Sequence, residues 1–433
     1  MSSKPSYRNP WAWIPSLYFA EGIPYVVAMT VSVIMYKRMG ISNTDIALYT
    51  SWLYLPWVIK PLWSPFVDIL RTKRYWIVAM QLIVGAGLAG VAFVIPVDNF
   101  FQYTLAFFWL MAFSSATHDI AADGFYMLAL TEKDQSFFVG IRSTFYRVAM
   151  ITGQGLLVML AGYFEEHPLM SADHAIASAW SVTFLVLAGL FLAFFIYHRF
   201  ILPYPVIDRP AGAGTGEIMR EFAATFTSFF RKPAVGLMLT FLLLYRLAEA
   251  QLVKLAQPFM LDGREAGGLG LSTTEVGFVY GTVGVVALTL GGLLGGFVAS
   301  RKGLKYWLWW MLVAINLPDA VYVYLSYAQP ENFFIVNICV AVEQLGYGFG
   351  FTAYMLYMIY VSQGKYQTAH YALCTGFMAL GMMLPGMASG WLQEQIGYQM
   401  FFLWVMIATI PGFVVARFVS VNPEFGKKNE KTP

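Results

Sequence analysis

Long apolar segments alternate with short polar segments along the whole chain, a pattern typical of helices that cross a lipid bilayer. A helix needs about 20 mostly apolar residues to cross the hydrocarbon core. Twelve segments of the sequence reach this length, so we predict an all-α membrane protein with 12 transmembrane helices. The predicted spans are 11–36, 45–64, 75–95, 101–130, 139–163, 175–200, 235–260, 274–299, 306–327, 332–362, 368–388 and 400–419.

The positive charges between the spans predict an orientation. If the N-terminus is cytoplasmic, the cytoplasmic segments hold 20 of the 27 Lys and Arg residues, and the opposite side holds only Lys37, Arg38 and Arg264. Lys and Arg concentrate in cytoplasmic loops. We therefore expect both termini to be cytoplasmic.

Composition supports a membrane protein. Only 12% of the residues are charged and 58% are hydrophobic, whereas soluble proteins carry about 25% charged residues. The net charge of +3 gives no reason to expect a nucleic-acid partner. Cys339 and Cys374 both lie in apolar runs, which favours free buried thiols over a disulfide framework or a zinc site.

The polar segment near the middle of the chain divides it into two halves. We predict an N-terminal six-helix bundle over 1–200, a cytoplasmic linker over 201–233, a C-terminal six-helix bundle over 234–420 and a polar cytoplasmic tail over 421–433. The linker begins with three prolines and a Gly-rich run, which is typical of a flexible connection. We predict a short helix on the membrane surface in the second part of the linker, because four apolar residues there share one helical face. They are Ile218, Phe222, Phe226 and Phe229.

The two halves repeat each other at an offset of 228–231 residues. Gly40-Ile-Ser-Asn-Thr-Asp-Ile46 matches Gly270-Leu-Ser-Thr-Thr-Glu-Val276, and Tyr126-Met-Leu128 matches Tyr354-Met-Leu356. The first pair places a Ser three residues before an acid, which is close to a helix capping box. Six spans per half give two parallel bundles related by a pseudo-twofold axis along the membrane normal. Major facilitator transporters have this arrangement, with the substrate site between the halves.

Two basic turns occupy equivalent positions in the repeats, at Arg71-Thr-Lys-Arg74 and Arg301-Lys-Gly-Leu-Lys305. With Asp68 before it, the first turn resembles the cytoplasmic loop signature of that superfamily, although the usual leading glycine is missing. We predict a cytoplasmic gating loop formed by Asp68, Arg71, Arg74 and Arg301. Ordinary positive charge on the cytoplasmic side is the alternative interpretation.

Ten charged residues lie inside predicted spans and at least four residues from either end of the span. Such a side chain costs roughly 2.5 kcal/mol or more at the bilayer centre, so it normally faces a bundle interior or a water-filled cavity. The ten residues are Glu21, Lys60, Asp119, Asp123, Arg147, Arg246, Glu249, Lys254, Asp319 and Glu343.

The acids of this group are candidates for proton coupling. Asp119 and Asp123 are four residues apart and share one helical face, and Glu343 lies in the fourth span of the second half. The internal repeat does not pair these acids with one another, so each half has specialised its fourth span. A carboxyl group whose partner changes between two conformations couples proton binding to movement. The alternative is a static salt bridge, as Arg246 and Glu249 could form. We interpret the neighbouring His118 as a hydrogen-bonded interior histidine.

The bases of this group are candidates for holding an anionic substrate, because Arg and Lys bind carboxylates and phosphates. Neighbouring Tyr and Gln side chains could bind sugar hydroxyls. Lys60 could instead extend to the cytoplasmic surface. The candidate substrate-binding residues are Lys60, Arg147, Arg246, Lys254, Tyr146, Gln154, Gln344 and Tyr347.

Several motifs together resemble the AmpG family of the major facilitator superfamily. They are Glu21-Gly-Ile-Pro24, Lys60-Pro-Leu-Trp-Ser-Pro-Phe-Val-Asp68, Thr117-His-Asp-Ile-Ala-Ala-Asp123, Leu244-Tyr-Arg-Leu-Ala-Glu249, Glu343-Gln-Leu-Gly-Tyr-Gly348 and Gln367-Thr-Ala-His-Tyr-Ala-Leu373. The acetyl-coenzyme A transporter family is a more distant relative. The AmpG resemblance implies a proton-coupled importer of the bacterial inner membrane, whose characterised members carry anhydro-muropeptides.

The resemblance also extends the site. It implies functional roles for five residues: Lys60, Asp119, Asp123, Glu249 and Glu343. Together with Glu21, an acid within the first span, the candidate proton-coupling residues are Asp119, Asp123, Glu343, Glu21 and Glu249. The family often has Gln, Lys and Asp where His118, Arg246 and Glu249 stand here. These departures leave another acidic disaccharide from glycan breakdown as an alternative substrate.

Other function classes remain as alternatives. A membrane-embedded enzyme needs a catalytic constellation, but the loops contain no metal-spaced His cluster, nucleophile elbow or P-loop. An exporter of drugs or siderophores would share the fold, and a receptor would not explain the charges within the spans. We therefore expect a monomeric symporter surrounded by lipid that imports an anionic saccharide, with a proton as coupling ion and no cofactor or metal.

Overall fold

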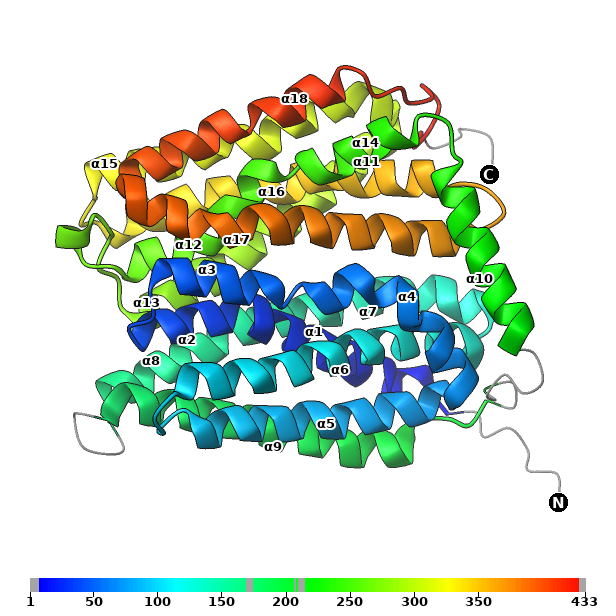
Figure 1. Cartoon of the computed structure of the whole chain (residues 1–433), viewed down its shortest axis with the longest axis horizontal. Helices are drawn as coiled ribbons and strands as arrows, with labels where there is room; N and C mark the ends of the chain where they lie inside the picture. Colours follow the sequence, from blue (N-terminus) through cyan, green and yellow to red (C-terminus); the bar gives the residue numbers. More distant parts are fainter. Residues whose placement is uncertain (1–7, 169–173, 206–207, 209–214, 428–433) are drawn as a thin grey trace. The chain divides into compact units, whose positions relative to one another are not determined.

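The structure is a computed structural model that describes residues 8–168, 174–205, 208 and 215–427, and every regular element among them is a helix (Figure 1). Contacts within the chain define two compact units. Unit 1 comprises Met1–Met39 and Ile59–Phe222, and unit 2 comprises Gly40–Val58 and Ala223–Pro433. The later division, after Phe222, falls within the predicted linker. The domain limits expected from the sequence stay predictions.

Unit 1 contains the helices of the first half except one. They are α1 (Ile14–Val26), α2 (Ser32–Arg38), most of α4 (Leu55–Leu70), α5 (Lys73–Val94), α6 (Phe100–Ala129), α7 (Glu132–Met150), α8 (Val158–Glu166) and α9 (Ala175–Ile201). One π-helical turn over Val27–Val31 joins α1 to α2, and another over Ile151–Leu157 joins α7 to α8. Helix α5 packs against both α6 and α9.

Unit 2 contains α3 and the helices of the second half. They are α3 (Asn43–Trp52), α11 (Val235–Leu244), α12 (Leu247–Leu261), α13 (Thr273–Val276), α14 (Val285–Asn316), α15 (Ala320–Ala328), α16 (Phe333–Ser362), α17 (Gln367–Ala408) and α18 (Ile410–Ala416). Helix α10 (Thr215–Phe230) contains the boundary between the two units. The capping box predicted at Ser272 and Glu275 is confirmed at the start of α13.

Eight helices in the described part of the chain are long and apolar enough to cross a membrane. Two of these have about twice the necessary length, Thr273–Ala328 and Gln367–Ala416. Each is interrupted by a glycine with positive φ, Gly303 at 80° and Gly397 at 75°. These glycines lie where the sequence predicts loops. Helical residues make up most of every predicted span, but the number of 12 crossings and the cytoplasmic termini stay predictions.

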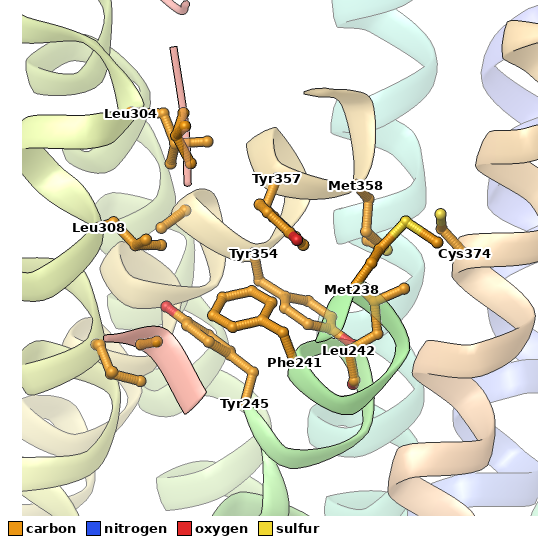
Figure 2. Packing of buried hydrophobic residues seen from close by; sticks show 14 of the residues in the cluster. Met238, Phe241, Leu242, Tyr245, Leu304, Leu308, Tyr354, Tyr357, Met358 and Cys374 are labelled. Atoms are coloured by element: carbon orange, nitrogen blue, oxygen red, sulfur yellow. The ribbon is translucent and has the colours of Figure 1, made fainter. Parts of the chain in front are cut away.

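Aromatic and aliphatic side chains fill the core of unit 2 (Figure 2). The rings of Tyr245 and Tyr354 stack with their centres 4.9 Å apart. The Tyr245 hydroxyl donates to the Gly350 carbonyl at 2.9 Å, and the Tyr354 hydroxyl donates to the Leu242 carbonyl at 2.5 Å. The polar end of each ring is therefore satisfied inside an apolar core.

Glycines let α14 and α16 approach closely. A Cβ atom on Gly348 would lie 2.0 Å from the Leu288 carbonyl oxygen, and one on Gly291 would lie 2.1 Å from the Leu345 oxygen. Both distances are far shorter than any real contact, so only glycine fits at these positions. Small residues at helix interfaces are typical of packing inside membranes.

Helix α3 packs against α17 within unit 2 (Figure 1). The Asn43 amide donates to Gln393 Oε1 at 2.7 Å and to the Tyr398 hydroxyl at 2.9 Å. Gly390 leaves room for this contact, because a Cβ there would lie 1.9 Å from the Asn43 carbonyl oxygen. Hydrogen bonds and close packing together explain why α3 belongs to unit 2.

Two polar segments of the second half also pack against its helices. The linker forms helix α10 as predicted, and its Phe229 is fully buried against Phe377. In the tail, the Phe425 carbonyl accepts a hydrogen bond from the Leu304 amide at 3.0 Å, beside the turn at Gly303. The Phe425 ring contacts Tyr360 at 4.9 Å. Residues 421–427 of the predicted tail therefore lie against unit 2.

Candidate functional site

Five charged side chains from four helices form a cluster in unit 1. Lys60 of α4 forms an ion pair with Asp119 of α6, and Arg142 of α7 forms one with Asp123 at 2.9 Å. Glu21 of α1 completes the set, close enough to Asp119 and Asp123 for their charges to interact. We call Glu21, Lys60, Asp119, Asp123 and Arg142 the unit 1 cluster.

The unit 1 cluster holds three acids but only two bases. The two ion pairs use Asp119, Asp123 and both bases. Glu21 is only 8% exposed, and its Oε2 atom has no hydrogen-bond partner among the described residues. Glu21 is therefore the acid of the cluster that lacks a counter-ion.

Arg142 is a site residue that the sequence analysis missed. Its guanidinium lies over the rings of Tyr18 at 4.6 Å and Tyr126 at 5.1 Å, besides its pair with Asp123. Arg142 lies close to the cytoplasmic end of the predicted span 139–163, and the sequence analysis counts it among the cytoplasmic charges. Helix α7 begins at Glu132, with Thr131 accepting a hydrogen bond from the Asp134 amide at 3.2 Å. This capping sequence was the signal for the earlier start.

A chain of hydrogen bonds, most of them buried, connects three other helices of unit 1 to His118, which is next to Asp119 of the unit 1 cluster. Ser16 hydrogen-bonds His198 Nε2 at 2.9 Å, and His198 Nδ1 donates to Gln81 Oε1 at 2.9 Å. The Gln81 amide then donates to His118 Nε2 at 3.0 Å. His118 precedes Asp119 in the chain, so these bonds connect α1, α9 and α5 to the acidic face of α6. The prediction of a hydrogen-bonded interior histidine is confirmed.

Three acids from separate segments converge in unit 2. Glu249 lies in the first turn of α12, Asp319 in the 3-10 turn Leu317–Asp319, and Glu343 in α16. One carboxylate oxygen from each lies within 4.8 Å of the others. The three residues are 1–3% exposed. Gln344 donates to Glu343 Oε2 at 2.9 Å. We call Glu249, Asp319 and Glu343 the carboxylate triad; its oxygen atoms are ligands suited to a hard cation.

Two buried bases in unit 2 have only neutral partners among the described residues. Arg246 donates to the Tyr347 hydroxyl and lies 5.0 Å from the centre of the Phe351 ring. Lys254 donates to Thr50 Oγ1 at 3.0 Å and lies 5.2 Å from the centre of the Tyr54 ring. The ion pair between Arg246 and Glu249, which we considered from their spacing, is absent from the described residues. Arg246 and Lys254 are 9% and 2% exposed.

The remaining substrate candidates of the first half lie on α7 and the π-helical turn that follows it. Arg147 and Tyr146 are half-buried, and Arg147 Nη1 has no hydrogen-bond partner among the described residues. Gln154 is 7% exposed in the π-helical turn. Lys60, in contrast, already forms an ion pair with Asp119 in this structure.

Among the described side chains of the predicted gating loop, Arg74 is held by hydrogen bonds. Its Nε donates to the Leu202 carbonyl at 3.4 Å, and its guanidinium lies 3.8 Å from the centre of the Tyr204 ring. Arg71 and Arg301 are exposed and lie over Tyr75 and Phe297 respectively. The side chain of Asp68 lies outside the described residues. Gating by this loop stays a prediction.

Comparisons with curated proteins support the AmpG resemblance. The chain is 24% identical over 421 residues to the "Anhydromuropeptide permease" of Escherichia coli K12, covering 96% of this chain and 80% of that protein. It is also 24% identical over 421 residues to the "Putative transporter AmpG 4" of Rickettsia conorii, covering 94% of this chain and 95% of that protein. The resemblance seen in the sequence motifs is confirmed.

Solved transporters share the fold. The nucleoside transporter NupG covers 94% of this chain and 98% of its own, with a TM-score of 0.68 and 15% identity. A D-xylose-proton symporter covers 96% and 98%, with a TM-score of 0.70 and 12% identity. These likenesses confirm the predicted all-α membrane fold.

The family match agrees with both comparisons. Residues 16–360 match the Major Facilitator Superfamily. The chain is therefore a transporter and not an enzyme, as predicted, and a multi-pass protein of the bacterial inner membrane. This chain belongs to the Major Facilitator Superfamily.

Proposed function

We propose that this transporter is a proton-coupled symporter that imports an anionic amino-sugar oligosaccharide, such as an anhydro-muropeptide, by alternating access. The observation that supports this proposal most is the pair of buried bases, Arg246 and Lys254, which form no ion pair with an acid among the described residues. The name of the Escherichia coli relative points to the same class of substrate.

An anionic substrate would supply the charge that these bases lack. A buried cation without a counter-ion is strongly unfavourable. The Tyr347 and Thr50 hydroxyls satisfy hydrogen bonds of Arg246 and Lys254 but do not neutralise their charge. A carboxylate or phosphate group can bind the Arg246 guanidinium through two parallel hydrogen bonds. Arg147, with its unpartnered Nη1, is a further candidate for such a contact.

The unit 1 cluster is our candidate for proton coupling. With three acids and two bases, it is neutral only when one acid carries a proton. Glu21 is the acid left over from the two ion pairs. If Lys60 or Arg142 changes its acidic partner during the cycle, a different acid must bind or release the proton. Asp119 and Asp123 would participate in this exchange, which links the protonation state to the conformation.

Uptake by proteoliposomes under an imposed inward proton gradient tests the proposal. We expect the wild-type protein to accumulate a labelled anhydro-muropeptide above its external concentration. Glu21→Gln should abolish this accumulation but keep exchange between labelled and unlabelled substrate, because exchange needs no net proton movement. Lys365→Gln, a change at an exposed position, is the control and should transport normally.

A second set of measurements tests the anionic class. An analogue whose carboxylates are amidated should be transported much more slowly, and Arg246→Gln should remove the preference for the charged form. Equal rates for charged and amidated substrates would contradict the proposal. Accumulation of an acidic disaccharide in place of the muropeptide would identify the alternative substrate, and proton-driven efflux would indicate an exporter.

A further inference from the structure

Three oxygen atoms of the carboxylate triad have no hydrogen-bond partner among the described residues. Asp319 is 1% exposed, and neither of its carboxylate oxygens has a hydrogen-bond partner in the part of the chain that the structure describes. Glu249 Oε2 also has none. Tyr322 is fully buried and lies close enough to the triad for the charges of all three acids to act on it. Its hydroxyl also has no hydrogen-bond partner among the described residues. Buried polar atoms nearly always have a partner, so four unpartnered oxygens in one region require an explanation.

Close packing holds the triad together. Asp319 ends the turn that interrupts the helix after α14, and Gly346 of α16 lies directly against this turn. A Cβ atom on Gly346 would lie 2.7 Å from Pro318 Cγ and 2.3 Å from the Ala314 carbonyl oxygen. Glu343 lies three residues before Gly346, on the same face of α16. The missing side chain at Gly346 therefore allows Asp319 to reach Glu343.

The charge of the triad also requires compensation. Its three carboxyl groups share a site in which ionised acids would repel one another strongly. Arg246 is the base whose charge acts on Glu249, but it donates to Tyr347. Lys254 binds Thr50. The described residues therefore leave the triad with more negative than positive charge.

We propose that Glu249, Asp319 and Glu343 bind a hard metal cation, of the class that includes Na⁺ and Ca²⁺. Oxygens bound to Ca²⁺ lie about 2.3–2.6 Å from the ion, so two of them can be about 5 Å apart. The triad oxygens, within 4.8 Å of one another, meet this condition. Carboxylate oxygens without a thiolate or imidazole favour such ions over zinc or copper.

This assignment gives Glu249 and Glu343 a metal-ligand role in place of the proton-coupling role predicted from the sequence. It also adds Asp319, to which the sequence analysis assigned no specific role. The unit 1 cluster differs in kind, because two bases already neutralise two of its three acids. A cation in the triad would satisfy the unpartnered oxygens of Asp319 and Glu249 together.

Cation-dependent stabilisation of the purified full-length chain tests the assignment. Thermal unfolding would be followed by tryptophan fluorescence while NaCl, CaCl₂ or MgCl₂ replaces choline chloride at constant ionic strength. We expect at least one of these metal ions to raise the unfolding temperature saturably, since a ligand that binds only the folded state stabilises it. Asp319→Asn should raise the half-saturating concentration at least about tenfold, as the loss of even an outer-shell partner can.

Two further measurements keep the result interpretable. Glu331→Gln, which changes an exposed acid of the same unit, should keep the wild-type response. Direct binding of ²²Na⁺ or ⁴⁵Ca²⁺ to the wild-type protein, and its loss in Glu343→Gln, would support the site if Asp319→Asn does not fold. Stabilisation that depends only on pH, or an unchanged metal response in both triad variants, would overturn the assignment. No transport substrate is present, so this result is independent of the proposed function.

Discussion

Replacement of Lys60 by Met tests whether the ion pair with Asp119 stabilises unit 1. The two side chains are 21% and 19% exposed, so the pair is largely buried. Loss of one partner of a buried pair costs about 3–5 kcal/mol, because the other charge stays behind uncompensated. Because both side chains are still partly exposed to solvent, we expect a value at the lower end of this range. Lys60→Met should therefore lower the free energy of unfolding by about 3 kcal/mol. This corresponds to a roughly 160-fold change in the unfolding equilibrium.

Because the unit 1 cluster has more acids than bases, removal of the acid of this pair should lower the free energy of unfolding less than removal of Lys60. Lys60→Met leaves three acids with one base, whereas Asp119→Asn leaves two acids with two bases. Lys60 can then interact with Asp123 or Glu21, whose charges already act on it. We expect Asp119→Asn to cost about 1–2 kcal/mol. The double variant should be less destabilised than Lys60→Met alone, because removing a whole buried pair is often nearly neutral.

Reversible unfolding by SDS in mixed micelles measures all four proteins of this double-mutant cycle. Tryptophan fluorescence reports unfolding, and the coupling free energy follows from the four values. We expect a coupling of at least about 1 kcal/mol, as for residues in one charge network. Effects of the two single changes that add within about 0.5 kcal/mol would refute the reasoning, because additivity is the behaviour of independent sites.

Three further changes test packing and backbone geometry by thermal unfolding. Gly348→Ala should destabilise the protein by about 1–3 kcal/mol, because its Cβ would overlap the Leu288 carbonyl. Gly296→Ala, in open space on α14, should instead stabilise the protein by about 0.5–1 kcal/mol. Equal changes in unfolding free energy for the two variants would contradict this interpretation. Gly397→Ala should cost about 1–3 kcal/mol, because φ near 75° with ψ near 167° is accessible only to glycine; an unchanged unfolding temperature would show that the turn relaxes. Gln81→Leu should cost at least about 2 kcal/mol, since it leaves a nitrogen of each neighbouring histidine unpartnered; a neutral effect would mean that these hydrogen bonds do not stabilise unit 1.

The sequence predicted those features of the fold that depend on local patterns. Apolar segment length located the helices, and the Ser272 cap marked the start of α13. The loops expected near residues 303 and 397 correspond to glycines with positive φ. Each of these signals lies within a few neighbouring residues, so no knowledge of the tertiary structure was needed.

The partners of the charged residues were harder to predict. Spacing suggested that Arg246 pairs with Glu249, but Arg246 is the N-cap of α12, with φ −113° and ψ 23°. Helical spacing does not apply across that break, and the side chain reaches Tyr347 of α16 instead. Similarly, His118 and His198 meet only through Gln81. No sequence periodicity relates segments so far apart in the chain.

The carboxylate triad shows the same limit more clearly. Glu343 was a candidate because an acid in an apolar helix is unusual, and Glu249 was added through the AmpG resemblance. Asp319 was one of the ten charged residues within the spans, and the sequence analysis assigned it no role. Its place beside Glu343 depends on Gly346, a glycine that the motifs did not distinguish from its neighbours.

The position of residues 421–427 affects how reporters should be attached to this protein. A fluorescent protein or purification tag fused directly after Arg417 would remove Phe425, whose carbonyl accepts the Leu304 amide beside the Gly303 turn. A fusion placed beyond Lys427 keeps that hydrogen bond and the ring contact with Tyr360. Reporters of membrane topology and of expression level should therefore begin after this segment.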